Sequence, residues 1–482
     1  MHPVVRRAED LVVIDESLFL NGSFVTAHGS DVLAVDDSTT EQVIAHVRAA
    51  SYEDIDRAVE AARLAQPEWA ATPLAERRAI VAAAGEKLAA MGDEVIALIM
   101  AEVGTPRSEA RVAQLGAAIR AFQHASEFAD VVQDREPVGT AEVIHEPAGV
   151  IAAVTPWNYP LFLMGLKVAP ALIAGCAVIA KPSELAPLST MTLARVLAEA
   201  GIPDGVFALV QGDGNVGGYL AGHPGLDLVT FTGSVATGRR VAAAAAEHGV
   251  RTTLELGGKS ASLVMDPTLA VEAARFTLAN AMSNAGQTCA ALTRLIVPRA
   301  TMADVESVLE AECSGLVVGD PRDDSTSVGP LVSERERDRV RAMIAEAEAS
   351  GMRIVAGGSK TPAGCERGWF VQPTVVVESE PTSRLAREEV FGPVLSVIAY
   401  DSPEHAVELA EETEFGLVAR VWDVDDSRFE TTARRLRVGG VSRNGVATEW
   451  AAPFGGVKAS GYGRERGRAG IEEFLVAKAI HQ

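Results

Sequence analysis

The sequence has few cysteines and few positive charges for its length. Of 482 residues only four are cysteine, and Cys176, Cys289, Cys313 and Cys365 form no Cys-x-x-Cys pair. Such spacing predicts neither a disulfide framework nor a zinc site nor a dithiol redox centre. Lys and Arg number 43 against 65 Asp and Glu, which gives a net charge of −22. That charge disfavours nucleic acid and anionic lipid as main partners, because both repel an acidic surface.

Long apolar runs are also missing. The longest, from Val168 to Ala180, is too short to span a bilayer and contains Pro170 and Gly175. The first residues lead directly into acidic residues with no apolar core, so no secretory signal is expected. We therefore expect no membrane partner and a location in the reducing cytoplasm.

Short apolar runs alternate with helical patterns from residue 150 onward. The expected strands are 150–154, 177–180, 206–210 and 228–231, followed by 261–265, 353–356 and 394–399. Buried strands separated by helices predict right-handed βαβ units in a parallel sheet, and hence an α/β fold. Before them the chain is expected to be helical, with a capping box from Ser51 to Asp54 and a helix from about Leu74 to Met91. Polar alternating stretches at 131–146 and from Phe474 onward are expected to be edge strands.

The segment from Gly212 to Gly217 fits the pattern G-x-G-x-x-G and follows an expected strand. Such a pattern can mark a pyrophosphate-binding turn. No clear acidic ribose ligand follows about 20 residues later, as that turn requires. We therefore interpret the segment as a glycine-rich turn from strand to helix.

Three motifs carry candidate chemistry. Cys289 ends the run Asn-Ala-Gly-Gln-Thr-Cys, and its thiol can add to a carbonyl carbon. Asn158, in Pro-Trp-Asn-Tyr-Pro, supplies an amide that can hold an oxyanion together with the backbone N–H of Cys289. Glu255, between two leucines before a glycine pair, is expected to be partly desolvated, which raises its pKa and suits a general base. The alternative for Cys289 is a buried structural cysteine, and that for Asn158 is an Asx turn between the flanking prolines. The alternative for Glu255 is an exposed carboxylate at a strand end.

With these motifs the chain resembles the aldehyde dehydrogenase superfamily, from about Leu20 to its end and in the expected order. The resemblance implies an α/β fold with a Rossmann-type cofactor domain, an α/β catalytic domain and a small two-stranded arm that pairs subunits into a homodimer or homotetramer. The implied boundaries are 1–125 with 147–257 for the NAD-binding domain, 258–453 for the catalytic domain, 126–146 with 469–482 for the arm, and 454–468 for a segment that returns near the active site.

The resemblance also implies NAD as cofactor in preference to NADP, and no metal. Lys181 and Glu184 match residues that hold the adenosine ribose, and Ser234 begins the pyrophosphate turn at a helix N-terminus. Glu389 and Phe391 match residues at the nicotinamide end. Further implied cofactor contacts are Thr155, Trp157, Ser183, Gly233, Gly238 and Gly257. Lys167 and Glu465 match positions suggested to relay protons from the base.

The predicted reaction is NAD-dependent oxidation of an aldehyde to the carboxylate, through a hemithioacetal and a thioester on Cys289 that water activated by Glu255 hydrolyses. One alternative is an acylating enzyme that uses coenzyme A in place of water and needs no Glu255. The other is a catalytically silent binding protein on the same fold. Cys176, Arg420 and Arg443 depart from the family pattern outside the catalytic set.

The substrate funnel implied by the resemblance is mostly apolar. Its expected wall residues are Tyr159, Phe162, Leu163, Leu166, Thr288 and Trp450. No Arg or Lys is expected there to bind a substrate carboxylate. Aliphatic or aromatic aldehydes are therefore favoured over acidic semialdehydes.

Overall fold

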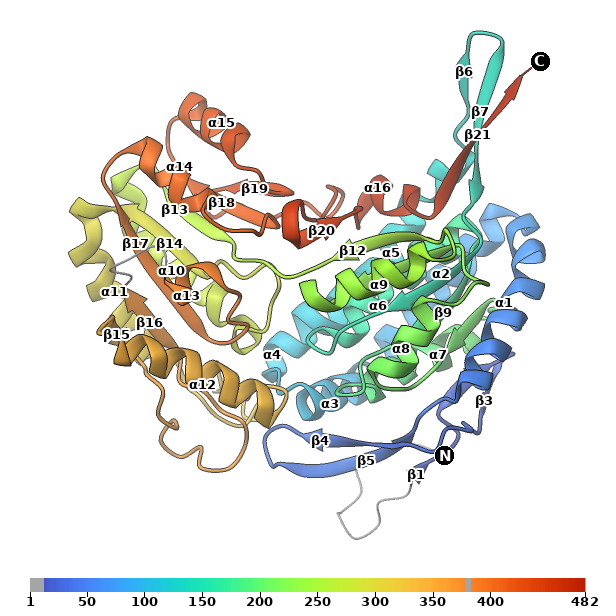
Figure 1. Cartoon of the computed structure of the whole chain (residues 1–482), viewed down its shortest axis with the longest axis horizontal. Helices are drawn as coiled ribbons and strands as arrows, with labels where there is room; N and C mark the ends of the chain where they lie inside the picture. Colours follow the sequence, from blue (N-terminus) through green and yellow to red (C-terminus); the bar gives the residue numbers. More distant parts are fainter. Residues whose placement is uncertain (1–12, 378–382, 482) are drawn as a thin grey trace.

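The computed structural model describes residues 13–377 and 383–481 of the chain. Residues 1–12, 378–382 and 482, which the sequence analysis assigns to the first domain, the catalytic domain and the arm, lie outside the described residues. Two lobes lie side by side, each built on its own sheet, and a narrow β arm projects from one of them (Figure 1). Both sheets are mostly parallel and carry helices, which confirms the predicted α/β fold class.

The first lobe is built on an eight-stranded sheet with the order β20-β12-β11-β8-β9-β10-β2-β3. Its strands are β2 (Leu18–Leu20), β3 (Ser23–Val25), β8 (Val150–Val154), β9 (Ala177–Lys181), β10 (Phe207–Leu209), β11 (Leu228–Thr232), β12 (Arg251–Glu255) and β20 (Gly461–Tyr462). The strands from β12 to β10 are parallel, and the pairings at both edges are antiparallel.

Alternate side chains of each strand enter two different cores, because successive residues point to opposite faces of a sheet. One face is covered by α2 (Leu74–Ala90), α5 (Ala117–Glu127), α6 (Pro160–Ala174) and α7 (Leu188–Glu199). The other is covered by α1 (Tyr52–Ala71), α8 (Gly214–Ala221) and α9 (Val235–Ala246). In β8, Ile151 and Ala153 join the first core, and Val150, Ala152 and Val154 join the second. This two-sided burial explains why the strand is apolar throughout.

The second lobe is built on a seven-stranded sheet with the order β15-β16-β17-β14-β13-β18-β19. Its strands are β13 (Ala261–Val264), β14 (Arg294–Pro298), β15 (Arg353–Ala356), β16 (Thr374–Val377), β17 (Val394–Tyr400), β18 (Val418–Trp422) and β19 (Gly440–Arg443). One face packs on α10 (Ala270–Met282), α11 (Met302–Ser314) and α12 (Glu334–Ala349), and the other on α14 (Pro403–Glu411) and α15 (Asp426–Arg435). Only β15 runs antiparallel to its neighbour.

The arm is a three-stranded antiparallel sheet with the order β21-β7-β6, not the expected two-stranded one. Its strands are β6 (Glu136–Val138), β7 (Ala141–Pro147) and β21 (Leu475–His481). The strand expected from Val131 begins only at Glu136, because Ala129–Gln133 forms a 3₁₀ turn. Cys176 lies at the base of the arm, where its thiol donates to the carbonyl oxygen of Phe474 at 3.4 Å.

The N-terminal region differs from the expectation that it is helical. The predicted capping box of α1 is confirmed: the Ser51 hydroxyl accepts from the Asp54 N–H at 3.1 Å, and the Asp54 carboxylate accepts from the Ser51 N–H at 3.0 Å. The predicted second helix is also present as α2. Residues 13–48, however, form strands. These are β2 and β3, together with the separate sheet of β1 (Val13–Ile14), β4 (Val32–Asp37) and β5 (Gln42–Arg48). The partners of β2 and β3 include β10, far away in the sequence, so no local pattern reveals the pairing.

The turn from Gly212 to Gly217 connects β10 to α8, as interpreted from the sequence. Asp213 caps the helix, because its carboxylate accepts from the N–H groups of Asn215 and Val216 at 2.9 and 3.2 Å. A Cβ at Gly212 would lie 2.5 Å from Val216, so the turn leaves no room for a side chain there.

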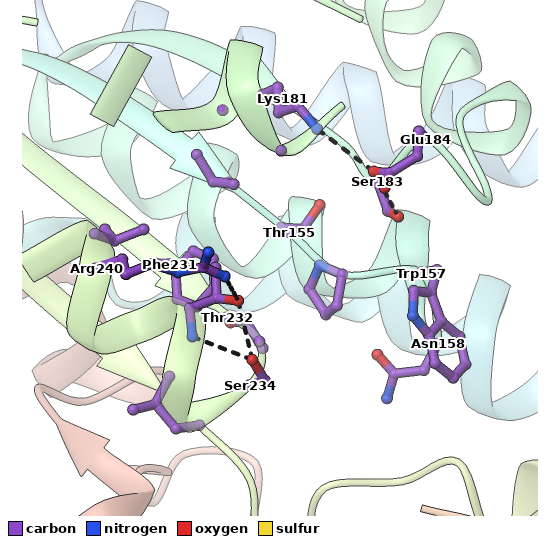
Figure 2. A pocket seen from close by; sticks show the side chains of 18 of the residues that line it. Thr155, Trp157, Asn158, Lys181, Ser183, Glu184, Phe231, Thr232, Ser234 and Arg240 are labelled. Atoms are coloured by element: carbon purple, nitrogen blue, oxygen red, sulfur yellow. Dashed lines mark hydrogen bonds and ion pairs between the residues drawn. The ribbon is translucent and has the colours of Figure 1, made fainter. Parts of the chain in front are cut away.

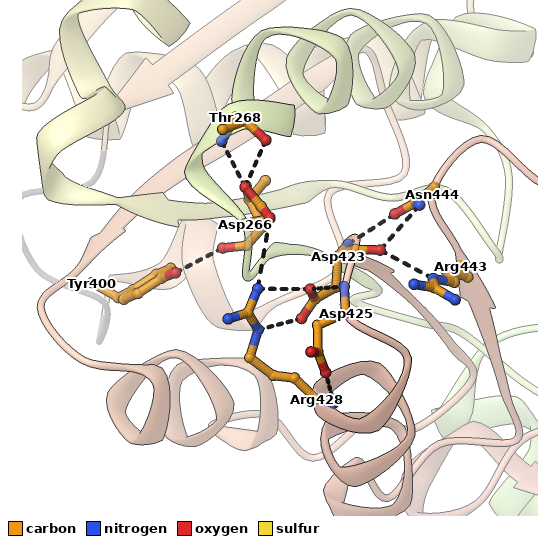
Figure 3. Close-up of polar contacts among 9 residues, drawn as sticks. Asp266, Thr268, Tyr400, Asp423, Asp425, Arg428, Arg443 and Asn444 are labelled. Carbon is orange, nitrogen blue, oxygen red and sulfur yellow. Dashed lines mark hydrogen bonds and ion pairs between the residues drawn. The ribbon is translucent and has the colours of Figure 1, made fainter.

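Two of the residues that depart from the family pattern, Arg420 and Arg443, hold the chain after β19. Arg443 donates to the carbonyl oxygen of Asp423 at 3.0 Å, and the Asp423 N–H donates to the Asn444 side chain at 2.8 Å (Figure 3). Arg420 donates to the carbonyl oxygen of Val446 at 2.9 Å. Both arginines therefore fix the start of the loop that leads to Trp450. Among the helices of the described residues, none combines the length and the apolar composition needed to cross a membrane.

Candidate functional site

A cavity of about 890 Å³ lies where four parallel strands of the first lobe end. Thr155 follows β8, Lys181 ends β9, Thr232 ends β11 and Glu255 ends β12, and all four line the cavity. The opposite wall comes from the second lobe and includes Cys289. Ligands of parallel α/β sheets bind at the carboxyl ends of the strands, so this cavity is the candidate ligand-binding site.

Lys181 and Glu184 form one polar end of the cavity (Figure 2). The ammonium of Lys181 donates to the carbonyl oxygen of Pro182 at 3.0 Å and lies 3.8 Å from the Glu184 carboxylate. Burial lowers the pKa of Lys181, while Glu184 and Asp213 act in the opposite direction. Glu184 remains 40% exposed, so its carboxylate is accessible to a polar ligand.

Ser234 caps the N-terminus of α9 beside this end. Its hydroxyl oxygen accepts from the Thr237 N–H at 3.2 Å. A Cβ at Gly238 would lie 2.6 Å from Leu256, and one at Gly233 would lie 2.5 Å from the Phe231 ring. Both positions therefore require glycine for the close packing of this turn. The sequence analysis missed Arg240, which also lines the cavity and donates to the Thr237 hydroxyl at 3.2 Å.

The loop that carries Cys289 is held in a strained conformation. Asn284 and Ala285 have positive φ angles of 50° and 54°, which cost roughly 1–3 kcal/mol each in non-glycine residues. Glu109, at the end of α4 (Arg107–Glu109), accepts from the Asn284 N–H at 2.8 Å and from the Ser283 hydroxyl. A Cβ at Gly286 would lie 2.0 Å from the carbonyl oxygen of Gly392. Glu109 thus supports the loop from a distant helix, and no motif in the sequence marks it.

Asn158 is buried just before α6 and faces the same cavity. Its amide nitrogen donates to the carbonyl oxygen of Gln287 at 2.9 Å. An amide nitrogen carries two hydrogens, so one remains for a ligand. The carbonyl oxygen of Asn158 accepts from Gln114 and Asn284 at 2.9 and 3.0 Å, which fixes the backbone against the Cys289 loop.

Glu255 is 6% exposed, and its Oε1 atom has no hydrogen-bond partner among the described residues. Burial raises the pKa of Glu255 well above its usual value, and the neighbouring Glu465 raises it further against the opposing effect of Lys167. The direction agrees with the expectation from its flanking leucines. A Cβ at Gly455 would lie 2.7 Å from Oε1, so the C-terminal segment packs directly on this carboxylate.

Lys167 and Glu465 form a buried ion pair behind Glu255. The Lys167 ammonium lies 2.7 Å from Glu465 Oε1 and donates to the Thr230 hydroxyl at 3.1 Å. Glu255 and Glu465 also share the wall of a small cavity next to Thr230. A proton that leaves Glu255 therefore has titratable neighbours on the side away from the large cavity.

Glu389 fixes the junction between the two lobes. Its carboxylate accepts from the Gly258 N–H at 2.8 Å, and burial raises its pKa to about 7. A Cβ at Gly257 would lie 2.3 Å from this carboxylate, and one at Gly258 would lie 2.5 Å from the carbonyl oxygen of Cys289. Beside it, the Phe391 ring meets the Trp157 ring edge-on, with centroids 5.4 Å apart.

The predicted funnel residues lie together next to Cys289. Tyr159, Leu163 and Leu166 form a buried cluster with Phe162 and Trp450 at its edge. The Tyr159 hydroxyl is 2.7 Å from the hydroxyl of Thr288, the residue before Cys289. An arginine also borders this cluster, because the guanidinium carbon of Arg466 lies 4.6 Å from the Trp450 ring centroid and 5.9 Å from that of Phe162. The sequence analysis did not place Arg466 here, because it is about 300 residues away from Phe162 in the chain.

The remaining predictions fall into two groups. The predicted residues that line the large cavity are Thr155, Trp157, Asn158, Lys181, Ser183, Glu184, Gly233, Ser234, Glu255, Gly257, Cys289, Glu389 and Phe391. Gly238, Lys167 and Glu465 lie behind its wall. Cavity residues that the sequence analysis did not assign to the site include Arg335 and Arg339 of α12, and Gly214 and Gly217. Of these four, only the two glycines belong to a recognisable sequence pattern, which was interpreted as a structural turn.

Known proteins resemble this chain over nearly its whole length. The sequence profile of the aldehyde dehydrogenase family matches residues 24–480. A 3-succinoylsemialdehyde-pyridine dehydrogenase from a Pseudomonas species is 39% identical over 469 residues, which cover 96% of this chain and 97% of that protein. A geranial dehydrogenase from Castellaniella defragrans is 36% identical over an alignment that covers 98% of this chain and 99% of that protein.

Solved structures of aldehyde dehydrogenases also superpose closely on this chain. A mutant of aldehyde dehydrogenase C from Pseudomonas syringae, in complex with NAD⁺ and octanal, superposes with a TM-score of 0.94 at 39% identity and covers 97% of this chain and 96% of its own. An aldehyde dehydrogenase from Mycobacterium tuberculosis in complex with NAD⁺ superposes with a TM-score of 0.93 at 36% identity, covering 98% and 99%.

The surroundings of Cys289 predict a thiol that ionises only at high pH. Burial, with added repulsion from Glu255, Glu389 and Glu465, raises its pKa to about 12. In the protein without ligands, the rate of alkylation of Cys289 by iodoacetamide is expected to rise from pH 7 to pH 10 without a plateau, measured by mass spectrometry of the modified peptide. Cys289→Ala is the control, because the other three cysteines are buried. A plateau near neutral pH would contradict this assignment.

Proposed function

This chain belongs to the aldehyde dehydrogenase family, and we infer that it oxidises an aldehyde to the carboxylate with NAD as cofactor, through a thioester on Cys289. One observation carries the inference. A single cavity is lined at one end by Cys289, Asn158 and Glu255, and at the other by Lys181, Ser183 and Glu184. The first three supply a nucleophile, an oxyanion donor and a base, and the second three suit the hydroxyls of a ribose.

The cavity wall fits NAD. The hydroxyls of Thr155 and Thr232 are buried without a partner among the described residues, so a polar ligand would satisfy them. The N-terminus of α9 at Ser234 suits the pyrophosphate, because N–H groups and the helix dipole favour anions. Glu389 would hold the nicotinamide ribose. The NAD⁺ complexes of the Pseudomonas syringae and Mycobacterium tuberculosis relatives support the same cofactor here.

In the first half-reaction the Cys289 sulfur adds to the aldehyde carbon. Because burial keeps the thiol protonated, a base must take its proton as the C–S bond forms, and Glu255 lines the same cavity. The Asn158 amide and the Cys289 N–H hold the oxyanion; loss of one such donor costs roughly 10²–10³ in kcat. NAD, when bound, accepts the hydride that leaves the substrate carbon. A thioester then remains on Cys289.

In the second half-reaction Glu255 takes a proton from water, and the oxygen attacks the thioester carbon. The C–S bond breaks, the acid leaves and Cys289 is restored. A base with a raised pKa accepts this proton near neutral pH more readily than an ordinary carboxylate. Glu465, on the far side of Glu255 and paired with the Lys167 ammonium, is placed to receive the proton afterwards.

Glu255 also distinguishes this proposal from its alternatives. An acylating enzyme has no need for a buried base aimed at the thioester. A silent binding protein has no need for the strained loop that holds Cys289. We further propose that the first lobe is the NAD-binding domain and the second the catalytic domain. For the substrate we propose an aldehyde whose body packs on the cluster of Tyr159, Phe162 and Trp450.

Glu255→Gln is expected to separate the two half-reactions. The amide cannot take a proton from water, so the enzyme is expected to form at most about one NADH per site and then turn over slowly. Stopped-flow absorbance of NADH measures both phases. Cys289→Ala, as control, is expected to give neither phase while still binding NAD. Strong acceleration of the native enzyme by coenzyme A, with an acyl-CoA product, would favour the acylating alternative.

Glu184→Gln is expected to shift cofactor preference toward NADP. A carboxylate accepts hydrogen bonds from the ribose hydroxyls of NAD but repels the 2′-phosphate of NADP. The ratio of kcat/KM for NAD to that for NADP is expected to fall roughly tenfold or more. Glu199→Gln, at an exposed carboxylate at the end of α7, is the control and should leave the ratio unchanged. A native enzyme that uses NADP as well as NAD would contradict the role of Glu184.

We propose that the arm pairs subunits into a homodimer or homotetramer. β21 has an unpaired edge, and Val138, Val476 and Ile480 are exposed on the arm. Removal of residues 476–482 is expected to convert the oligomer to a monomer in sedimentation velocity, because the edge strand is lost. Lys478→Ala, which removes only an exposed ion pair with Glu146, is the control and should stay oligomeric. A native chain that sediments as a monomer would overturn the proposal.

A further inference from the structure

Arg466 lies beside the cluster of Tyr159, Phe162 and Trp450, among three aromatic rings from two separate segments. Its guanidinium carbon is 4.6 Å from the ring centroids of Trp450 and Phe454, and 5.9 Å from that of Phe162. A second guanidinium, that of Arg120 from α5, lies 5.3 Å from the Trp450 ring. The cluster that the sequence predicts to be apolar therefore carries two cations around one indole.

The side chain of Arg466 lacks a polar partner in the part of the chain that the structure describes. Its buried Nε–H donates to no acceptor among the described residues, and no described carboxylate forms an ion pair with Arg466. Aromatic rings attract a guanidinium, but they do not replace a hydrogen-bond acceptor. An arginine in this state is stabilised by any ligand that brings an oxygen acceptor to it.

The backbone of Arg466 is also strained. Its φ of 68° is rare for a residue with a side chain, and its carbonyl oxygen accepts from the Gly470 N–H at 2.8 Å, which fixes the position. Glycine would adopt this conformation without strain. Strained residues of this kind gather at sites that bind ligands.

A continuous set of side chains connects Cys289 to Arg466. Thr288 touches Tyr159, whose ring centroid is 6.3 Å from that of Phe162, and Phe162 is 5.7 Å from Trp450. Burial lowers the pKa of Arg466, and the charges of Glu465, Cys289 and Glu255 raise it. Arg466 is thus close enough to the reacting thiol to share its electrostatic surroundings. A substrate that extended from Cys289 along these side chains would reach Arg466.

We propose that Arg466 is a specificity-determining residue that binds an oxygen acceptor, a carboxylate or a ketone carbonyl, on the part of the substrate beyond its aldehyde group. The assignment rests on the proposed function, because it takes the aldehyde carbon to be at Cys289. It places oxygenated aldehydes ahead of plain hydrocarbon aldehydes of the same length. Carboxylates gain most, because a guanidinium binds them through two parallel hydrogen bonds.

Three aldehydes of equal chain length test the proposal: hexanal, 5-oxohexanal and 6-oxohexanoate. The native enzyme is expected to show a higher kcat/KM for one or both oxygenated aldehydes than for hexanal, chiefly through a lower KM. In Arg466→Leu the ratio of kcat/KM for the oxygenated aldehyde to that for hexanal is expected to fall roughly 10- to 100-fold. The two oxygenated substrates show whether the acceptor is a carboxylate or a ketone.

Two further variants separate binding from packing. Arg466→Gln keeps hydrogen-bond donors without the charge, so it is expected to retain preference for the ketone better than for the carboxylate. Arg468→Leu removes an exposed arginine two residues away and is the matched control, with the native ratio expected. If Arg466→Leu fails to fold, Arg466→Gln replaces it in the comparison with the native enzyme.

The outcomes distinguish this inference from the proposed function. If no aldehyde gives NADH, the proposed function fails. If hexanal is oxidised but the native enzyme shows no preference for either oxygenated aldehyde, the role of Arg466 fails alone. An equal loss of kcat/KM for all three substrates in both Arg466 variants would show that Arg466 only supports the fold of this segment, and would overturn the proposal.

Discussion

The geometry of the site depends on how closely two segments pack against Gly257 and Gly258. One segment carries Glu389 and the other carries Cys289. Here the chain leaves β12 of the first sheet and enters β13 of the second, so the lobes are joined at this point. Any Cβ would lie 2.3 Å from the Glu389 carboxylate at one glycine and 2.5 Å from the Cys289 backbone at the other. The absence of side chains at these two glycines therefore allows Cys289 of one lobe and Glu255 of the other to line the same cavity.

Electrostatic repulsion shapes the chemistry at this junction. Glu255, Glu389 and Glu465 all raise the pKa of the Cys289 thiol, and burial raises the pKa values of Glu255 and Glu389 themselves. Buried carboxylates hold protons more strongly than exposed ones, because the interior solvates their charge poorly. These carboxylates therefore oppose ionisation of the thiol and of one another, and the buried Lys167 ammonium offsets the charge of Glu465.

Local motifs indicated the candidate residues whose position depends on their own segment. Cys289, Asn158 and Glu255 each follow or end an element that positions them, so their sequence context carried the information. Residues that act through distant contacts could not be predicted in this way. Glu109 supports the Cys289 loop across 174 positions in the chain, and nothing in its own segment marks it. The strands before α1 were missed for the same reason, since β2 pairs with β10 only in three dimensions.

The two ends of the proposed substrate path, at Cys289 and at Arg466, are built from different kinds of contact. At Cys289 the contacts are made by backbone against glycine, where any added atom clashes. At the outer end the contacts are between side chains from α5, α6, the loop at Trp450 and the segment at Arg466. A change of one side chain there alters the wall without moving the backbone that holds the nucleophile. Under the proposed function, substrate choice would therefore depend on positions such as 120, 450 and 466, while the backbone around Cys289 depends on Gly258 and Gly286, where a Cβ would overlap backbone oxygens.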